Sequence, residues 1–283
     1  MTLPLPPELP ILPTPRERAF LVLMNPDATV ESFGAVVEGD PSLTAAVLRA
    51  ANSAMSFPAR PVRGATEGVV RLGTSAVRHL ITATLVRSEF ASVEAAGIDA
   101  EELWRHLLGC ALLCEAQAKP KRDDNLRQTA FTAGLLHDLG RLAMAAQAPT
   151  RYRQVVDAAQ EGMGTHEAER FLFGVDHAEF GQRICERWRL AEDVCAAVGD
   201  HHDCLDDERF TRVGGPRDVN VFLARAREVM TGLGIGDGVL RPEAPDPAYD
   251  QHPLVLAVGG KAELTNSIRW FRDSTTARAE RSA

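Results

Sequence analysis

Apolar residues recur along most of the chain at the spacing of an amphipathic helix. From residue 16 to about residue 233 they fall three or four positions apart, and the strict alternation of a half-buried strand is nearly absent. No internal repeat of fixed period is visible, which favours an irregular bundle over a helical solenoid. The pattern predicts an all-α protein.

Capping and breaking residues set the bounds of the first predicted helices. Asp40 is a natural N-cap, so a helix is expected from there to near Asn52. Two prolines break the following stretch, 57–64, which we interpret as a connecting loop. A short helix then ends at Gly73, and Thr74 caps the next one.

A junction is expected near residue 98. Gly97 ends one helix, and Asp99 with Glu102 has the spacing of a capping box that opens the next. The predicted organisation is an N-terminal helical subdomain at 1–98, a helical bundle at 99–235, and a loop with a C-terminal helix at 236–283. Helices beyond the junction are predicted at 99–118, 125–146, 150–161, 165–173, 176–188, 191–202, 218–232 and 259–272.

Composition narrows the class of protein. The 283 residues are 45% hydrophobic with a formal net charge of -8, and no basic run is long enough to neutralise many phosphates, so nucleic-acid binding is not expected. The proline-rich start lacks the features of a signal peptide, and no apolar stretch reaches the length of about 20 residues that a membrane span needs. We therefore expect a cytoplasmic protein without a membrane partner. The start itself is interpreted as an extended lead-in or as a polyproline segment that binds a partner.

The five cysteines do not suggest a cysteine-based site. Their number is odd and no CxxC pair occurs, which argues against both a disulfide framework and a zinc ribbon. Cys110 and Cys114, four apart on one predicted helix, are interpreted as small buried residues.

One polar pair interrupts an otherwise apolar helix. Residues 135–140 read LLHDLG, with His137 and Asp138 between leucines. A buried polar group costs several kcal/mol unless it finds a partner. The candidate partners are a metal ion, a hydrogen-bond network or a water-filled cleft.

Further histidines lie on or at the ends of predicted helices, namely His106, His177, His201 and His202. Imidazole and carboxylate suit zinc, iron, manganese or nickel, and a helical bundle can aim them inward. A metal held in this way usually activates a bound water for hydrolysis. The same groups can also hydrogen-bond one another with no ion, and the spacing leaves both readings open.

Local context gives each histidine a separate expectation. His106 lies on or beside the buried stripe of its helix, where a partnered core residue is the simpler reading. His177 follows the N-cap Asp176 and falls in a first helical turn. At the C-terminal end of its helix, His201 is placed where the helix dipole favours the protonated form, and His166 is expected to be solvated.

Taken in order, several segments resemble the HDOD domain proteins of bacteria, a branch of the HD superfamily. GDPSLTAAVLRAANSA is similar to that family's signature around an Asn-Ser pair, and GVVRLGTSAVRHLI is similar to the segment that follows it. The order is completed by LW with His106, AFTAGLLHDLGRL, LFGVDHAEFG and AVGDHH. The resemblance covers residues 10–235 and is more specific than any one motif.

The resemblance implies an N-terminal helical subdomain packed on an HD-like bundle, and a regulatory or adaptor role in bacterial signal transduction. It also implies that the positions of metal ligands in active HD enzymes are taken by His106, His137, Asp138, His177 and His201 or His202. Divalent manganese, iron, nickel or zinc would suit them.

One departure argues against catalysis. HD enzymes carry a further aspartate in a late helix, and FLARAREVMTGLG is aligned so that Arg225 stands there. A guanidinium at that position would repel a dication and is expected to pair with Asp138. Arg141 stands where cyclic-dinucleotide phosphodiesterases often carry lysine, but their GYP element is missing, so that activity is disfavoured.

Two functions follow from this comparison. The leading hypothesis is a non-catalytic signalling protein that binds a protein partner, or a small ligand in the HD cleft. The alternative is a metal-dependent phosphohydrolase in which the His/Asp set activates water, with His137 and Asp138 at its centre. DNA binding is not supported, because no basic recognition helix is present.

Overall fold

The computed structural model describes residues 19, 21–23, 25, 27–53, 60–89, 93–202, 217–240 and 244–276. In these ranges all regular structure is helical and no strand is assigned, which confirms the predicted all-α class. Of the helices within them, none has the length and apolar character needed to cross a membrane. The proline-rich start lies outside the described residues.

Contacts along the chain divide it into two compact units. The bundle unit comprises the described residues 93–264, and the N-terminal unit comprises the described residues 19–89 together with 265–276. The predicted boundary near residue 98 stays a prediction. The last helix, α16 (Lys261–Thr275), crosses the division, and most of its length is counted with the N-terminal unit.

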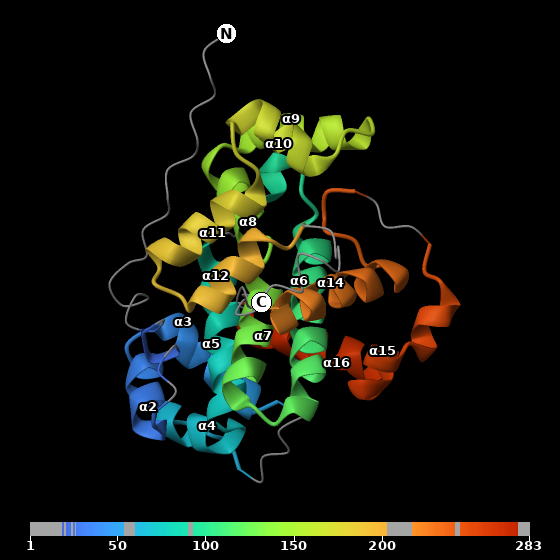
Figure 1. Cartoon of the computed structure of the whole chain (residues 1–283). Helices are drawn as coiled ribbons and strands as arrows, with labels where there is room; N and C mark the ends of the chain where they lie inside the picture. Colours follow the sequence, from blue (N-terminus) through green and yellow to red (C-terminus); the bar gives the residue numbers. More distant parts are fainter. Residues whose placement is uncertain are drawn as a thin grey trace, which may run out of the picture. The chain divides into compact units, whose positions relative to one another are not determined.

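Among its described residues, the N-terminal unit includes the helices α2 (Val30–Glu38), α3 (Pro41–Ala51), α4 (Ala65–Leu72) and α5 (Thr74–Glu89) (Figure 1). Asp40 caps α3 as predicted, because its side chain accepts hydrogen bonds from two backbone N–H groups of the first turn. Gly73 ends α4 with a φ of 80°, a conformation that a side chain would disfavour.

Residues far apart in the sequence close this unit. The Arg49 side chain donates to the Ser274 carbonyl oxygen at 3.0 and 2.7 Å, and Trp270 Nε1 donates to Ser53 Oγ at 2.9 Å. These bonds tie the C-terminal helix α16 to α3 and to the turn after it. The C-terminal helix is therefore part of the packing of this unit.

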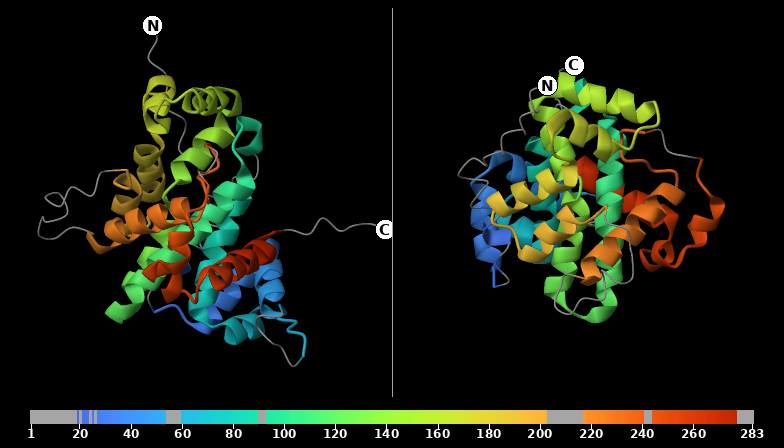
Figure 2. Two further views of the ribbon diagram at one scale, coloured as in Figure 1. Left: turned by 90° about the vertical axis from the view of Figure 1, so that its right-hand side faces the viewer. Right: turned by 45° about the horizontal axis from the view of Figure 1, so that its top comes forward.

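The bundle unit is built around three helices. α6 (Ala100–Ala118) and α7 (Asp124–Leu136) lie side by side, and α14 (Arg217–Gly232) packs against both (Figure 2). At Gly134 an added Cβ would lie 2.7 Å from the backbone of Ala111, so the absence of a side chain lets α7 approach α6 closely. Between them α6 and α7 contribute a mostly apolar interior.

Five further helices follow in the bundle unit before residue 200. They are α8 (Leu139–Gln147), α9 (Pro149–Gln160), α10 (Thr165–Phe173), α11 (His177–Arg187) and α12 (Glu192–Gly199). α11 packs against both α8 and α12, whereas α9 packs against α10. A Cβ at Gly140 of α8 would collide with the carbonyl oxygen of His177. This glycine therefore permits the start of α11 to lie directly against the start of α8.

The stretch predicted as a loop after residue 234 contains more structure than expected. A 3-10 helix, η4 (Pro247–Gln251), and a short helix, α15 (Pro253–Ala257), interrupt it. Both begin with a proline after a side-chain cap, Asp246 in the first case and His252 in the second. Proline is well tolerated at a first helical position, so a proline-rich segment of this kind can still contain short helices.

Candidate functional site

The His137–Asp138 pair lies at a break between two helices. A single helix over 125–146 was expected, and this prediction is wrong: α7 ends at Leu136 and α8 begins at Leu139. On a continuous helix neighbouring side chains would point about 100° apart. At the break both point to one site, where His137 Nε2 lies 3.5 Å from Asp138 Oδ2.

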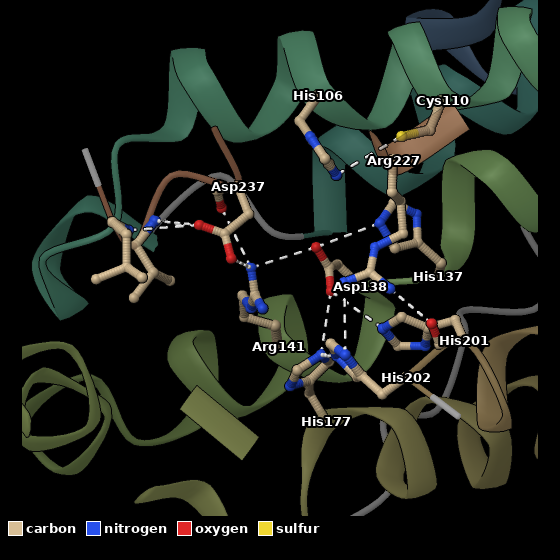
Figure 3. Close-up of polar contacts among 12 residues, drawn as sticks. His106, Cys110, His137, Asp138, Arg141, His177, His201, His202, Arg227 and Asp237 are labelled. Carbon is tan, nitrogen blue, oxygen red and sulfur yellow. Dashed lines mark hydrogen bonds and ion pairs between the residues drawn. The ribbon is translucent and has the colours of Figure 1, made fainter. Parts of the chain in front are cut away.

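The carboxylate of Asp138 is the centre of that site (Figure 3). His177 Nε2 lies 3.2 Å and His201 Nε2 3.6 Å from its Oδ1 atom. Its Oδ2 atom faces His137 and, at 3.3 Å, Arg141 Nη1. All five side chains are buried, with Asp138 only 2% exposed.

We call the imidazoles of His137, His177 and His201 the histidine side of Asp138. In two of them Nδ1 is fixed by the main chain: His137 Nδ1 lies 2.8 Å from the Gly134 carbonyl oxygen, and His201 Nδ1 lies 2.6 Å from that of Val198. A carbonyl oxygen only accepts, so Nδ1 carries the proton in both rings. In the neutral ring Nε2 then presents a lone pair to Asp138.

These lone pairs have no hydrogen-bond donor. His137 Nε2 and His201 Nε2 are buried and have no hydrogen-bond partner among the described residues. Two lone pairs beside an ionised carboxylate repel one another unless a cation lies between them. A divalent transition metal suits nitrogen and oxygen donors of this kind, so the residues fit such an ion. The ligand atoms of Asp138, His177, His201 and His202 all lie within 4.8 Å of one another.

The third imidazole is fixed by a carboxylate. His177 Nδ1 lies 2.5 Å from Glu169 Oε2, and the His177 backbone N–H donates to the same oxygen at 2.8 Å. Glu169 Oε1 accepts from the Tyr152 hydroxyl at 2.5 Å. Glu169 and Tyr152 were not expected from the sequence, and both are fully buried.

The second histidine of the DHH stretch lies at the edge of the site. α12 ends at Gly199, so His201 and His202 follow it in a turn and not in the helix predicted over 191–202. His202 Nε2 lies 2.7 Å from His177 Nε2, and His202 is only partly buried. The two residues therefore differ: His201 faces Asp138, and His202 contacts His177.

Opposite the histidines lies what we call the arginine side, which consists of Arg141 and Asp237. Arg141 is 2% exposed, and its Nη1 lies 2.9 Å from Asp237 Oδ2 and donates to the Asp237 carbonyl oxygen at 3.2 Å. Figure 3 shows the guanidinium between the carboxylates of Asp138 and Asp237. One oxygen of Asp138 is thus already paired with a fixed cation.

The cation that α14 contributes differs from the predicted one. Arg225 is exposed, so the prediction that it stands at the site and pairs with Asp138 is wrong. Arg227, two residues further along, donates from Nη1 to the His201 carbonyl oxygen at 2.6 Å, and its Nη2 lies 3.4 Å from His202 Nδ1. The sequence alignment was therefore displaced by about half a helical turn, and it is Arg141 that pairs with Asp138.

Three acidic residues, Asp200, Asp203 and Asp218, precede Arg225 in the sequence and carry the carboxylate that a late metal ligand would need. Asp200 is exposed, and Asp218 lies 3.2 Å from Lys121 Nζ on the surface. Asp203 lies outside the described residues. Neither described residue belongs to the candidate metal-binding groups.

His106 belongs to a neighbouring group with Cys110 and His137. Its Nε2 lies 3.6 Å from Cys110 Sγ, and its ring centroid lies 5.3 Å from that of His137. Burial raises the pKa of the Cys110 thiol, so the sulfur stays protonated. His106 is buried as expected. It contacts His137, and it is His137 that faces the Asp138 carboxylate.

Burial controls the charge of the site. It lowers the pKa of His201 to about 4 and that of His137 well below the ordinary value, so both rings are neutral near pH 7. The protonated His201 expected from the helix dipole is therefore not found. Burial also opposes ionisation of Asp138, but Arg141 and the adjacent imidazoles outweigh it and hold the pKa of Asp138 well below its usual range.

His177 is the exception among the three imidazoles. Burial favours its neutral form, but the Glu169 carboxylate outweighs burial and raises the pKa of His177 to about 9. The ring is thus protonated near pH 7 when no metal is bound. A metal ion at Nε2 would displace this proton, so metal binding and proton release are linked.

The sequence predicted the histidines and the aspartate of the site, but not the residues that hold them in place. Its histidines and Asp138 meet as expected, and His166 is exposed as expected. The residues missed are Tyr152, Glu169, Arg227 and Asp237. The one available signal was Glu169, a charged residue next to Ala168 and four before Phe173 on the buried face of α10.

Comparison with known proteins assigns the chain to a family. The family model of the HDOD domain matches residues 9–204, and the chain belongs to the HDOD family. That match contains the six predicted site residues. Arg227 and Asp237 lie beyond it.

Solved structures share the fold over nearly the whole chain. An HDOD domain protein with unknown function from Geobacter sulfurreducens is 26% identical with a TM-score of 0.67, and the match covers 95% of this chain and 92% of that one. A protein named "Putative signal transduction protein" from Marinobacter aquaeolei VT8 is 22% identical with a TM-score of 0.71, covering 93% and 60%. A "Putative metal-dependent phosphohydrolase" from Shewanella amazonensis SB2B is 20% identical with a TM-score of 0.55, covering 95% and 93%.

A curated relative is longer than this chain. An uncharacterized protein of Treponema pallidum (strain Nichols) is 23% identical over 197 residues, which are 69% of this chain and 38% of the relative. The chain thus spans well under half of that protein's length.

Proposed function

We propose that the chain is a non-catalytic regulatory module of bacterial signal transduction whose histidine side binds one divalent transition-metal ion. The observation that carries the proposal is the unequal surroundings of Asp138. The Oδ1 atom faces the Nε2 atoms of His177 and His201, and no fixed cation of the described residues lies between them. The Oδ2 atom is paired with the buried guanidinium of Arg141, and the His201 and His137 Nε2 atoms on the histidine side have no hydrogen-bond partner among the described residues. One added cation satisfies the histidine side, and no second one is needed.

The residues that would hold the ion are Asp138, His177 and His201, with His137 and His202 adjacent. Bound there, a metal supplies a positive charge to the carboxylate and the imidazole nitrogens. The chain's own part is to fix three Nδ1 atoms on acceptors so that the Nε2 atoms face inward.

The absence of catalysis is supported by the arginine side. Two-metal phosphoester hydrolysis needs ions about 3.5–4 Å apart that clamp the attacking and leaving oxygens. A second ion shared by Asp138 would have to displace Arg141, which is buried and also paired with Asp237. Breaking a buried pair of this kind costs about 3–5 kcal/mol, so Arg141 limits the carboxylate to one ion.

The test combines metal content with turnover. Protein purified without chelator or affinity nickel, and then loaded with manganese, iron, nickel or zinc, is assayed against phosphomonoesters, phosphodiesters and nucleotides. We expect about one ion per chain and no turnover. Hydrolysis that is abolished in a folded His137→Asn variant would overturn the proposal in favour of the alternative, a metal-dependent phosphohydrolase.

Signalling would require a protein partner that responds to the state of the site. The name of the Marinobacter protein supports this part of the proposal. Crosslinking in native cells, compared between the wild type and a folded His201→Asn variant, tests it. A partner captured only by the wild type is the expected result, and identical capture by both proteins contradicts it.

A further inference from the structure

A buried carboxylate behind the site has three hydrogen-bond donors directed at it. Glu169 Oε1 accepts from the Tyr152 hydroxyl, and Oε2 accepts from the backbone N–H and the Nδ1–H of His177. Glu169, Tyr152 and His177 are each 0% exposed. A carboxylate offers acceptor sites on both oxygens and no donor, so this arrangement leaves His177 Nδ1 no role except that of donor.

The arrangement has a consequence for the opposite ring nitrogen. Once Nδ1 is held as N–H by Glu169, the other nitrogen, Nε2, is the atom that faces Asp138 at 3.2 Å. A carboxylate on the far nitrogen of a metal-binding histidine fixes both the tautomer and the ring orientation, and makes the near nitrogen more basic. In His137 and His201 the Nδ1 atom instead donates to a neutral backbone carbonyl oxygen. His177 is thus the imidazole whose ligand atom is supported by a full negative charge.

We propose that Glu169, held in place by Tyr152, is a positioning residue that presents His177 Nε2 to a metal ion. The inference rests on the metal-binding part of the proposed function. Glu169 also binds the first backbone N–H of α11, where a negative charge is favourable for helix stability. Its structural role and its positioning role can be separated by the choice of substitution.

Glu169→Gln is the substitution that separates them. Glutamine has the same shape, its carbonyl can still accept from both His177 groups, and the Tyr152 hydroxyl can turn to accept from the new amide. The hydrogen bonds persist while the charge is lost. Tyr152→Phe keeps the charge and removes one anchor, and Glu167→Gln, on the exposed face of the same helix, is the matched control.

Two measurements are made on the full chain. The first is the Nδ1–H signal of His177 in the metal-free protein, observed by NMR after histidine labelling with nitrogen-15. The second is the affinity for Co²⁺, measured by calorimetry. We expect the far-downfield signal of a charge-assisted bond in the wild type and in Glu167→Gln, and its loss or upfield shift in Glu169→Gln.

Affinity for Co²⁺ is expected to fall about 10–100-fold in Glu169→Gln, by less in Tyr152→Phe, and not at all in Glu167→Gln. An unchanged Nδ1–H signal and unchanged affinity in Glu169→Gln overturn the inference while the proposed function stands. If the wild type binds no metal, the proposed function fails. The inference then fails with it, whereas unchanged affinity in Glu169→Gln beside a wild type that binds Co²⁺ overturns the inference alone.

Discussion

On the arginine side of Asp138 the guanidinium of Arg141 is paired with two carboxylates, although its buried Nε atom has no hydrogen-bond partner among the described residues. On the histidine side the buried Nε2 atoms of His137 and His201 have no such partner, and no fixed cation of the described residues lies between them and the carboxylate. Arg141 lies between two carboxylates at 3.3 and 2.9 Å. His137 and His201 present lone pairs to the same carboxylate at 3.5 and 3.6 Å. A buried ion pair with good geometry contributes to the folded state, but buried unsatisfied atoms reduce its stability. The comparison indicates that the arginine side supports the fold and that the histidine side is kept for a ligand.

The largest expected effect is on stability, at the residue that both sides share. Asp138→Asn leaves Arg141 with only Asp237 as an acidic partner in a buried position. Losing one member of a buried ion pair should lower the free energy of unfolding by on the order of 3 kcal/mol. Chemical denaturation measures this directly. A loss below about 1 kcal/mol would show that the arginine side does not support the fold.

The next effect should fall on metal binding and spare stability. In His201→Asn the new amide N–H can replace Nδ1–H at the Val198 carbonyl, while the Nε2 ligand atom is deleted. Affinity for Co²⁺ should fall by about 100-fold, with little change in the midpoint of thermal unfolding. Glu167→Gln, on the exposed face of α10, is the control. Equal affinities in the two variants would remove His201 from the ligand set.

A smaller effect is expected at the cation of α14. Arg227 places a positive charge beside His201 and His202, where it repels a dication. Arg227→Met should therefore raise the affinity for Co²⁺ by about tenfold, which is 1.4 kcal/mol. Arg225→Met, two residues away and exposed, should change nothing. A weaker affinity in Arg227→Met would mean that this guanidinium assists metal binding.

The smallest effect is the pH dependence of the metal-free protein. The pKa of His177 is raised to about 9, so its contribution to stability is complete below the unfolded value near 6.5 and is lost as pH rises through 9. The pKa of His201 is lowered to about 4, so its neutral burial costs stability as pH falls from about 6.5 toward 4. Thermal unfolding midpoints should be highest near neutral pH and fall by a few degrees on either side. In Glu169→Gln the alkaline decline should be smaller.

The fold could be predicted well where capping and periodicity agree. Asp40, Gly73 and Asp99 mark helix ends in the structure as they do in the sequence. The helix predicted over 125–146 shows the limit of this method. Its apolar pattern continues through the break, because both halves are buried on nearly all sides.

The candidate metal ligands could be predicted from the sequence, but the residues that hydrogen-bond or pair with them could not. His137 and Asp138 are adjacent polar residues in an apolar run, which is a local signal. Glu169 and Asp237 reach the site only through the packing of α10 and of the segment after α14, and sequence spacing does not contain that information. The prediction of Arg225 in place of Arg227 has the same cause. The sequence alone does not show which face of α14 is turned toward the site.

The central claim is tested most directly by counting metal ions on the intact chain. Protein purified without chelator or affinity nickel, dialysed against Co²⁺ and analysed by elemental analysis, should hold about one ion per chain, and His201→Asn should hold almost none. One ion per chain would agree with a carboxylate that binds a metal ion on its histidine side and is paired with Arg141 on the other. No ion in the wild type, or the same content in both proteins, would contradict the account.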